Sequence, residues 1–68
     1  ANIKEATKVP SANDMLKQLL ADHELVCREI REALPVIQKL GDDVTVDILI
    51  ARLTVHEKTA WMLRSSID

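Results

Sequence analysis

The stretch Leu40-Gly41-Asp42-Asp43-Val44-Thr45-Val46-Asp47 decides how this 68-residue chain folds. Gly41 is the only glycine in the sequence, and it stands where the residue after a helix can adopt a left-handed conformation at little energetic cost. The aspartates that follow can cap a new helix and suit its positive N-terminal end. We therefore predict that one helix ends here, that another begins and that the chain turns back on itself.

The same aspartates also allow a functional interpretation. Asp42, Asp43 and Asp47 would lie within about two turns at the start of one helix. Copies of the chain meeting on a symmetry axis would then form an anionic ring that attracts cations. Short acids at a helix start are more commonly simple caps, and the stretch by itself leaves both interpretations open.

The composition indicates a small helical protein that needs a partner. Hydrophobic residues make up 47% of the sequence, only one residue is aromatic and no segment alternates as a strand would, which favours an all-α fold. A chain of this size buries only about 60% of its unfolded surface, so a core of its own would be marginal. The chain begins with alanine rather than methionine, and we expect it to continue a longer polypeptide.

Charge and cysteine content exclude several classes of function for this chain. Its net charge is −2 and it has no basic run, so the chain alone should bind DNA poorly. The single cysteine excludes an internal disulfide and is typical of a reducing compartment. No segment resembles a membrane span or a signal peptide, so we expect a cytoplasmic protein.

The apolar pattern predicts a connector at residues 1–10, followed by a two-helix hairpin over residues 11–68. The first helix should run from about residue 12 to 40, with Ser11 as its cap and a kink rather than a stop at Pro35. Its main stripe comprises Leu16, Leu19, His23, Val26, Ile30, Ala33, Ile37 and Leu40, broadened by Leu20, Cys27 and Leu34. On its solvent-exposed face we expect favourable charge pairs of Glu24 with Arg28 and of Arg28 with Glu32.

The second helix, from about residue 43 to 67, is predicted to be apolar on two faces. One stripe can face the first helix and comprises Val46, Leu49, Leu53, His56, Ala60, Leu63 and Ile67. The opposite side gathers Val44, Ile48, Ala51, Val55 and Met62. A hairpin covers only one of these faces, so the other should be an interface with further helices or with another copy. We expect Trp61 to pack at a helix junction.

The two histidines are the clearest candidates for metal ligands, because neutral imidazole binds metals well. In a hairpin that turns at Gly41, His23 should face Ala60 and His56 should face Val26. The two histidines would then be offset by about 6 Å along the helix axis, so we do not predict that they pair. Neither has the Glu-x-x-His spacing of di-iron bundles, and we expect satisfied interior histidines. Cys27 lies four residues after His23, a weak hint of a small metal site, but we expect it to act as a small hydrophobe.

A longer stretch resembles a known family. His56-Glu57-Lys58-Thr59-Ala60-Trp61-Met62-Leu63-Arg64-Ser65, preceded by Gly41-Asp42-Asp43-Val44-Thr45-Val46-Asp47-Ile48-Leu49, closely resembles the C-terminal half of Dps-type mini-ferritins. Ile3-Lys4-Glu5-Ala6 is similar to the segment after the short middle helix of that family, and Asp22-His23-Glu24 would sit in its third helix. The resemblance covers the whole chain and implies half of a ferritin-like four-helix bundle.

The resemblance also implies a function for the complete subunit. Such proteins form a shell of twelve copies that oxidises ferrous iron with peroxide, stores the ferric product and protects DNA under stress. The ferroxidase ligands of the family come from its first two helices, so the resemblance assigns no catalytic, cofactor-binding or iron-ligating residue to this chain. It does imply that Asp42 and Asp47, with Asp43 as an addition, line the three-fold pore through which iron enters.

Partners and location follow from the same resemblance. We expect this hairpin to pack against N-terminal helices or a second chain, and the complete subunit to form a homo-oligomer, a dodecamer by resemblance. DNA would be bound by the assembly and not through this chain, in the cytoplasm, with association with the nucleoid left open. The alternatives are a self-associating helical scaffold or adaptor without catalytic activity and a small metal-binding protein that uses His23 and Cys27.

Overall fold

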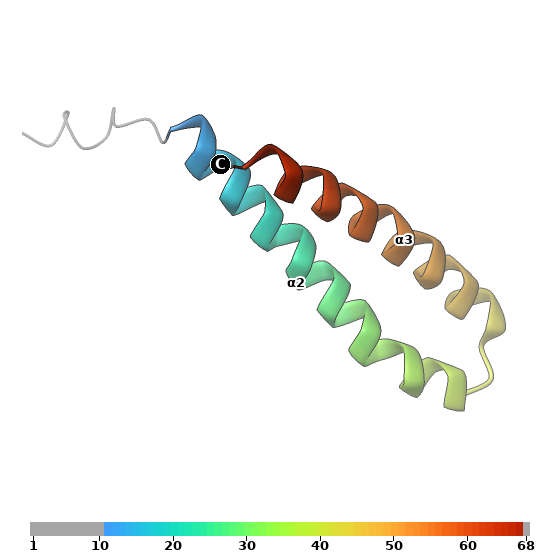
Figure 1. The fold of residues 1–68 in the computed structure, drawn as a ribbon. Coiled ribbons are helices and arrows are strands. Elements are labelled where there is room, and N and C mark those ends of the chain that lie inside the picture. The colour runs from blue at the N-terminus through green and yellow to red at the C-terminus, as the bar shows by residue number, and fades with distance from the viewer. Residues whose placement is uncertain (1–10, 68) are drawn as a thin grey trace, which may run out of the picture.

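The computed structural model describes residues 11–67 as two α-helices that pack against each other in an antiparallel hairpin (Figure 1). The first, α2, spans Ala12–Lys39, and the second, α3, spans Asp43–Ser66. No strand occurs between residues 11 and 67, which confirms the predicted all-α fold. The connector predicted at residues 1–10 lies outside the described residues, as does residue 68.

Helix α2 begins at the predicted cap. Ser11 has an extended backbone (φ −65°, ψ 160°), and its side-chain oxygen accepts a hydrogen bond from the Asp14 backbone N–H at 3.0 Å. The helix continues through Pro35, so that residue is not a stop. Leu40 and Ile67, the approximate helix ends that we predicted, are the C-caps of α2 and α3, each one residue beyond its helix.

The turn between the helices is built on Gly41. This residue has a φ of 78°, the left-handed conformation that glycine adopts without steric cost. Its N–H donates to the Gln38 carbonyl at 3.0 Å, and the Asp42 N–H donates to the Ile37 carbonyl at 3.4 Å. This pair of hydrogen bonds is the Schellman motif, which satisfies carbonyls left free at a helix end. The single glycine therefore places the end of α2, as predicted.

The core lies in the seam between the two helices. Its buried side chains are Cys27 and Ile30 from α2 and Val46 and Ala60 from α3. All four belong to the predicted facing stripes, and most other members of those stripes are half-buried. Leu19 and Leu40 are exceptions, because 46% and 79% of their surfaces remain exposed. Two helices alone therefore enclose a narrow core.

The outer face of α3 is exposed, as its two-sided pattern predicted. Val44, Ile48, Val55 and Met62 are each more than half exposed in the hairpin. Trp61 is 64% exposed, so α2 does not supply the helix junction at which we expect it to pack, and that expectation stays a prediction. The reason for its exposure is its angular position: Trp61 immediately follows the buried Ala60, and successive residues of a helix are about 100° apart.

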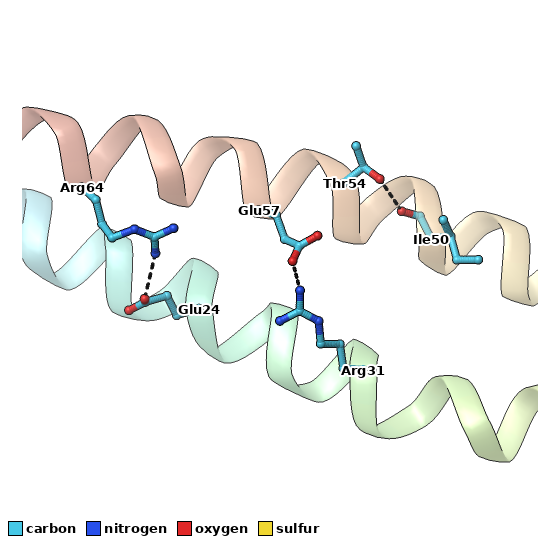
Figure 2. Close-up of polar contacts among 6 residues, drawn as sticks. All are labelled: Glu24, Arg31, Ile50, Thr54, Glu57 and Arg64. Atoms are coloured by element: carbon cyan, nitrogen blue, oxygen red, sulfur yellow. Dashed lines mark hydrogen bonds and ion pairs between the residues drawn. The ribbon is translucent and has the colours of Figure 1, made fainter.

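Two ion pairs connect the helices along one side of the seam (Figure 2). Arg31 pairs with Glu57, and Arg64 donates to Glu24 at 3.0 Å. All four side chains are substantially exposed, so each pair adds little stability. Figure 2 also shows the Thr54 hydroxyl donating to the Ile50 carbonyl within α3. The expected pairs of Arg28 with Glu24 and Glu32 do not form among the described residues. Glu24 pairs with Arg64 of α3 instead.

Candidate functional site

The three aspartates predicted as a cation-attracting group lie together at the tip of the hairpin, where α2 gives way to α3. Asp42 is the N-cap of α3, and Asp43 is its first residue. Asp47 follows one turn later. Residues four apart lie on the same side of a helix, so Asp43 and Asp47 are neighbours on the surface of α3. All three are exposed, and their charges face solvent in the hairpin.

Asp42 has the most defined geometry of the three. One carboxylate oxygen accepts from the Thr45 backbone N–H at 3.1 Å, and the other accepts from the Thr45 hydroxyl at 2.6 Å. These bonds, the side-chain one first, lower the pKa of the Asp42 carboxyl below its usual value, because they stabilise the charged form. The capping role predicted for this stretch is confirmed for Asp42. Because its oxygens already bind Thr45, Asp42 would act on a cation mainly through its charge.

The structure brings together the two histidines that we expected to lie apart. The Nδ1 atoms of His23 and His56 are 2.8 Å from each other, a hydrogen-bonding distance, and the ring centroids are 5.0 Å apart. The prediction that they do not pair is therefore wrong. It compared axial levels only, whereas two imidazoles that project into the gap between helices, typically about 8–10 Å wide, can span an offset of several Å. The useful sequence signal was that each histidine lies on the facing stripe of its helix.

A metal site at His23 and Cys27 receives no support from the geometry. Cys27 is buried among the core side chains, only 6% exposed, as a small hydrophobe would be. Within residues 11–67, no cluster of three or more histidine, cysteine, aspartate or glutamate side chains is arranged to hold a metal ion. The two histidines instead satisfy each other, as interior histidines do.

A shallow groove of about 460 Å³ runs along the ion-paired side of the seam. Cys27 and Ala60 line its apolar part, and the remaining lining residues are charged: Glu24, Arg28, Arg31, Glu32, Glu57 and Arg64. Three acids and three bases line the groove and four of these six residues form ion pairs, so the groove has no strong preference for one charge. Neither described helix has the length and apolar composition that a membrane crossing would need.

Comparisons with known proteins agree with this architecture. The family model described as Ferritin-like domain matches residues 1–68. The chain is 31% identical over its whole length to DNA protection during starvation protein 2 of Bacillus anthracis, of which it covers 47%. It is 40% identical over its whole length to a low temperature-induced protein of a Nostoc species, of which it covers 39%.

A third relative is matched at a similar identity and over a similar share of its length. Over 96% of its length, the chain is 33% identical to the DNA protection during starvation protein of Listeria innocua, of which it covers 43%. The chain thus spans less than half the length of these curated relatives and corresponds to their C-terminal half. No solved structure gives a significant match.

Proposed function

The chain belongs to the ferritin-like family, and from this premise we propose that it is the C-terminal part of a subunit that oxidises and stores iron and protects DNA. The relatives named for DNA protection during starvation support the DNA-protecting role. In this proposal iron is the substrate and cargo of the assembled protein. The residues that oxidise it lie outside this chain.

The observation that carries the proposal is the hairpin with one face covered and one face bare. Helix α3 packs Val46 and Ala60 against α2, while Val44, Ile48 and Met62 remain exposed on its other side. Several exposed large apolar residues on one helix face mark a surface that normally contacts protein. In a four-helix bundle, two further helices would supply that contact. The proposed partners are therefore N-terminal helices of the same subunit, followed by further copies in a dodecameric shell.

The aspartates at the tip give the chain its own part in the proposed activity. In a three-fold arrangement, each copy would contribute the charges of Asp42, Asp43 and Asp47 to one opening. Carboxylates around a narrow opening raise the local concentration of cations and speed their entry. We propose that these residues attract ferrous iron toward the interior without being oxidation ligands.

DNA protection would then come from the assembly and not from contacts of this hairpin. The chain has a net charge of −2, which disfavours binding to the phosphate backbone. Removal of ferrous iron and peroxide would protect DNA without direct contact. We place this activity in the cytoplasm, near the DNA that it protects.

The proposal is tested with the complete subunit. We expect the assembled protein to oxidise ferrous iron in the presence of peroxide, to retain the ferric product and to reduce cleavage of plasmid DNA by the same reagents. An assembled protein that neither oxidises nor retains iron would contradict the proposal.

A self-associating scaffold is the second candidate, and the same bare face of α3 favours it. Two hairpins could cover each other and form a four-helix bundle without any catalytic activity. The mass of the natural polypeptide separates the two candidates. A longer chain that contains this hairpin supports the ferritin-like subunit, whereas a 68-residue species that forms a stable dimer supports the scaffold.

A further inference from the structure

The hydrogen bond between His23 and His56 is a feature that the proposed iron chemistry does not use. It joins the midpoints of α2 and α3, with the two Nδ1 atoms 2.8 Å apart and the ring planes inclined by 43°. Both histidines are half-buried. Within the described residues, no further side chain joins them to complete a metal site. The geometry therefore points to a shared proton between the two rings.

The number of protons on the two rings decides whether this contact can exist. A neutral imidazole has one nitrogen that donates and one that accepts, and a charged imidazolium has two donors and no acceptor. The contact between the Nδ1 atoms needs one donor and one acceptor. It can therefore form when both rings are neutral or when one is charged. When both are charged, two N–H groups and two positive charges face each other, and the contact is lost.

The surroundings do not offer the pair a free counter-ion among the described residues. The ionisable side chains within about one turn of the two histidines are Asp22, Glu24 and Cys27 on α2, and Arg52, Glu57 and Lys58 on α3. The carboxylates have other partners: Asp22 accepts from Gln18, Glu24 pairs with Arg64, and Glu57 pairs with Arg31. Cys27 is a buried thiol, and the two remaining groups carry positive charge. Within the hairpin, every carboxylate beside the pair is thus engaged elsewhere when a second proton arrives.

We propose that His23 and His56 form a proton-sensitive contact that holds α2 against α3 and is released when both rings are protonated. Histidine side chains usually change charge between about pH 5 and pH 8. The contact between the two Nδ1 atoms tolerates a charge on one ring only, whereas separated helices place no such limit on the two rings. Acid favours a state that can hold more protons, so the packed state loses stability on acidification. The proposed iron chemistry is not needed for this effect.

The test compares the complete, assembled subunit with two variants at about pH 7.5 and about pH 5.5, on either side of the ordinary histidine range. His56→Asn places an amide close to the position of Nδ1, so that its oxygen can accept from His23 whether or not His23 is charged. Lys58→Gln is the control, because it changes an exposed charge two residues away and leaves the pair intact. The thermal midpoint is measured for each protein at both pH values.

We expect the midpoint of the wild type and of Lys58→Gln to fall on acidification, and that of His56→Asn to fall by less than half as much. Equal decreases in all three proteins would overturn the proposal. Hydrogen exchange of the wild type gives a second test that does not depend on how the variant folds. Peptides of both helices around the histidines should lose protection at the lower pH more than peptides at the turn, and unchanged protection there would also overturn it.

Discussion

Two adjacent residues at the turn perform opposite tasks. Gly41 ends α2, because its left-handed backbone directs two N–H groups onto the carbonyls of the last turn. Asp42 begins α3, because its carboxylate accepts from Thr45 at the first turn. The direction of the chain thus reverses within a few residues. The remaining acids at the tip, Asp43 and Asp47, are exposed to solvent.

Replacing Gly41 should cost stability through the backbone alone. A Cβ atom at this position would have no atom within 4 Å, so Gly41→Ala creates no clash. Its φ of 78° is nevertheless unfavourable for alanine, by roughly 1–2 kcal/mol. We expect Gly41→Ala to lower the free energy of unfolding of the complete subunit by about that amount. Gly41→Asn should lower it less, because asparagine tolerates the left-handed region, and equal losses would contradict this account.

The cap at Asp42 should make stability depend on acid pH. Because the hydrogen bonds from Thr45 lower the pKa of Asp42 in the folded state, the cap stabilises the protein above the unfolded-state pKa. Its contribution is lost as pH falls through the lowered, folded-state pKa. Asp42→Asn retains an oxygen for capping but does not titrate, so its stability should fall less between about pH 5 and pH 2. Urea unfolding at both pH values measures this, and Asp22→Asn is the control.

The two helices differ in how much of their apolar surface the hairpin covers. Helix α2 turns its apolar stripe toward α3 and most of its charged residues toward solvent. Helix α3 has apolar residues around most of its circumference, so only part of them can face α2. Two valines of α3 show the contrast: Val46 is 8% exposed and Val44 is 70% exposed. Substituting each of these two valines therefore measures whether its face of α3 is covered by another helix.

In the 68-residue chain, at a dilution at which ultracentrifugation shows a monomer, truncating the two valines should have unequal effects. Val46→Ala removes buried methyl groups at about 0.8 kcal/mol each, together with a cavity cost, so we expect a loss of about 2 kcal/mol. Val44→Ala removes surface that already contacts water in the hairpin and should change stability by less than about 0.5 kcal/mol. Thermal unfolding followed by circular dichroism makes the comparison. In the complete subunit we expect the cost of Val44→Ala to approach that of Val46→Ala, and a cost that stays near zero would contradict coverage of this face.

At the scale of the whole molecule, the chain is an incomplete bundle. It spans less than half the length of the curated relatives that it matches, and its two helices bury only four hydrophobic side chains well. Much of the rest of its apolar surface is exposed, and we propose that other helices cover it. Both the proposed shell and the proposed iron chemistry belong to this larger assembly.

The isolated 68-residue chain should therefore associate and should not oxidise iron rapidly. Its bare α3 face is an aggregation or docking surface, so we expect oligomers or a loosely packed state in analytical ultracentrifugation. The complete subunit, assayed at equal molar concentration, is the control for peroxide-dependent iron oxidation. A compact monomer at high concentration would contradict the first expectation, and saturable oxidation by the isolated chain would contradict the second.

Iron entry should depend on the acids at the tip. In the complete subunit, Asp42→Asn with Asp47→Asn removes two charges per copy and retains much of the cap, so folding should survive while iron uptake slows. The difference should shrink at high ionic strength, where salt screens the field. Glu29→Gln with Glu32→Gln removes the same charge from the surface of α2 and should leave uptake near the wild-type rate. Equal rates for all three proteins at both ionic strengths would leave the aspartates as caps only.

The sequence by itself determined the features that depend on neighbours within about one helical turn. Apolar spacing indicated two helices and their facing stripes, and Gly41 indicated the reversal of the chain. Ser11 and Asp42 are the N-cap residues of the two helices. The exposed second face of α3 also followed from spacing. These features are local, because a residue and its partner in a cap or stripe are separated by at most five positions.

Only the tertiary structure decided which side chains meet across the seam. The pairing of His23 with His56 and the choice of Arg64 as the partner of Glu24 both contradict expectations based on axial position or on neighbours within one helix. Long side chains span several Å along the helix axis, so their contacts depend on the rotation of each helix and on the separation between them. Those quantities are set by the packing of all the core side chains together, and no short stretch of sequence contains them.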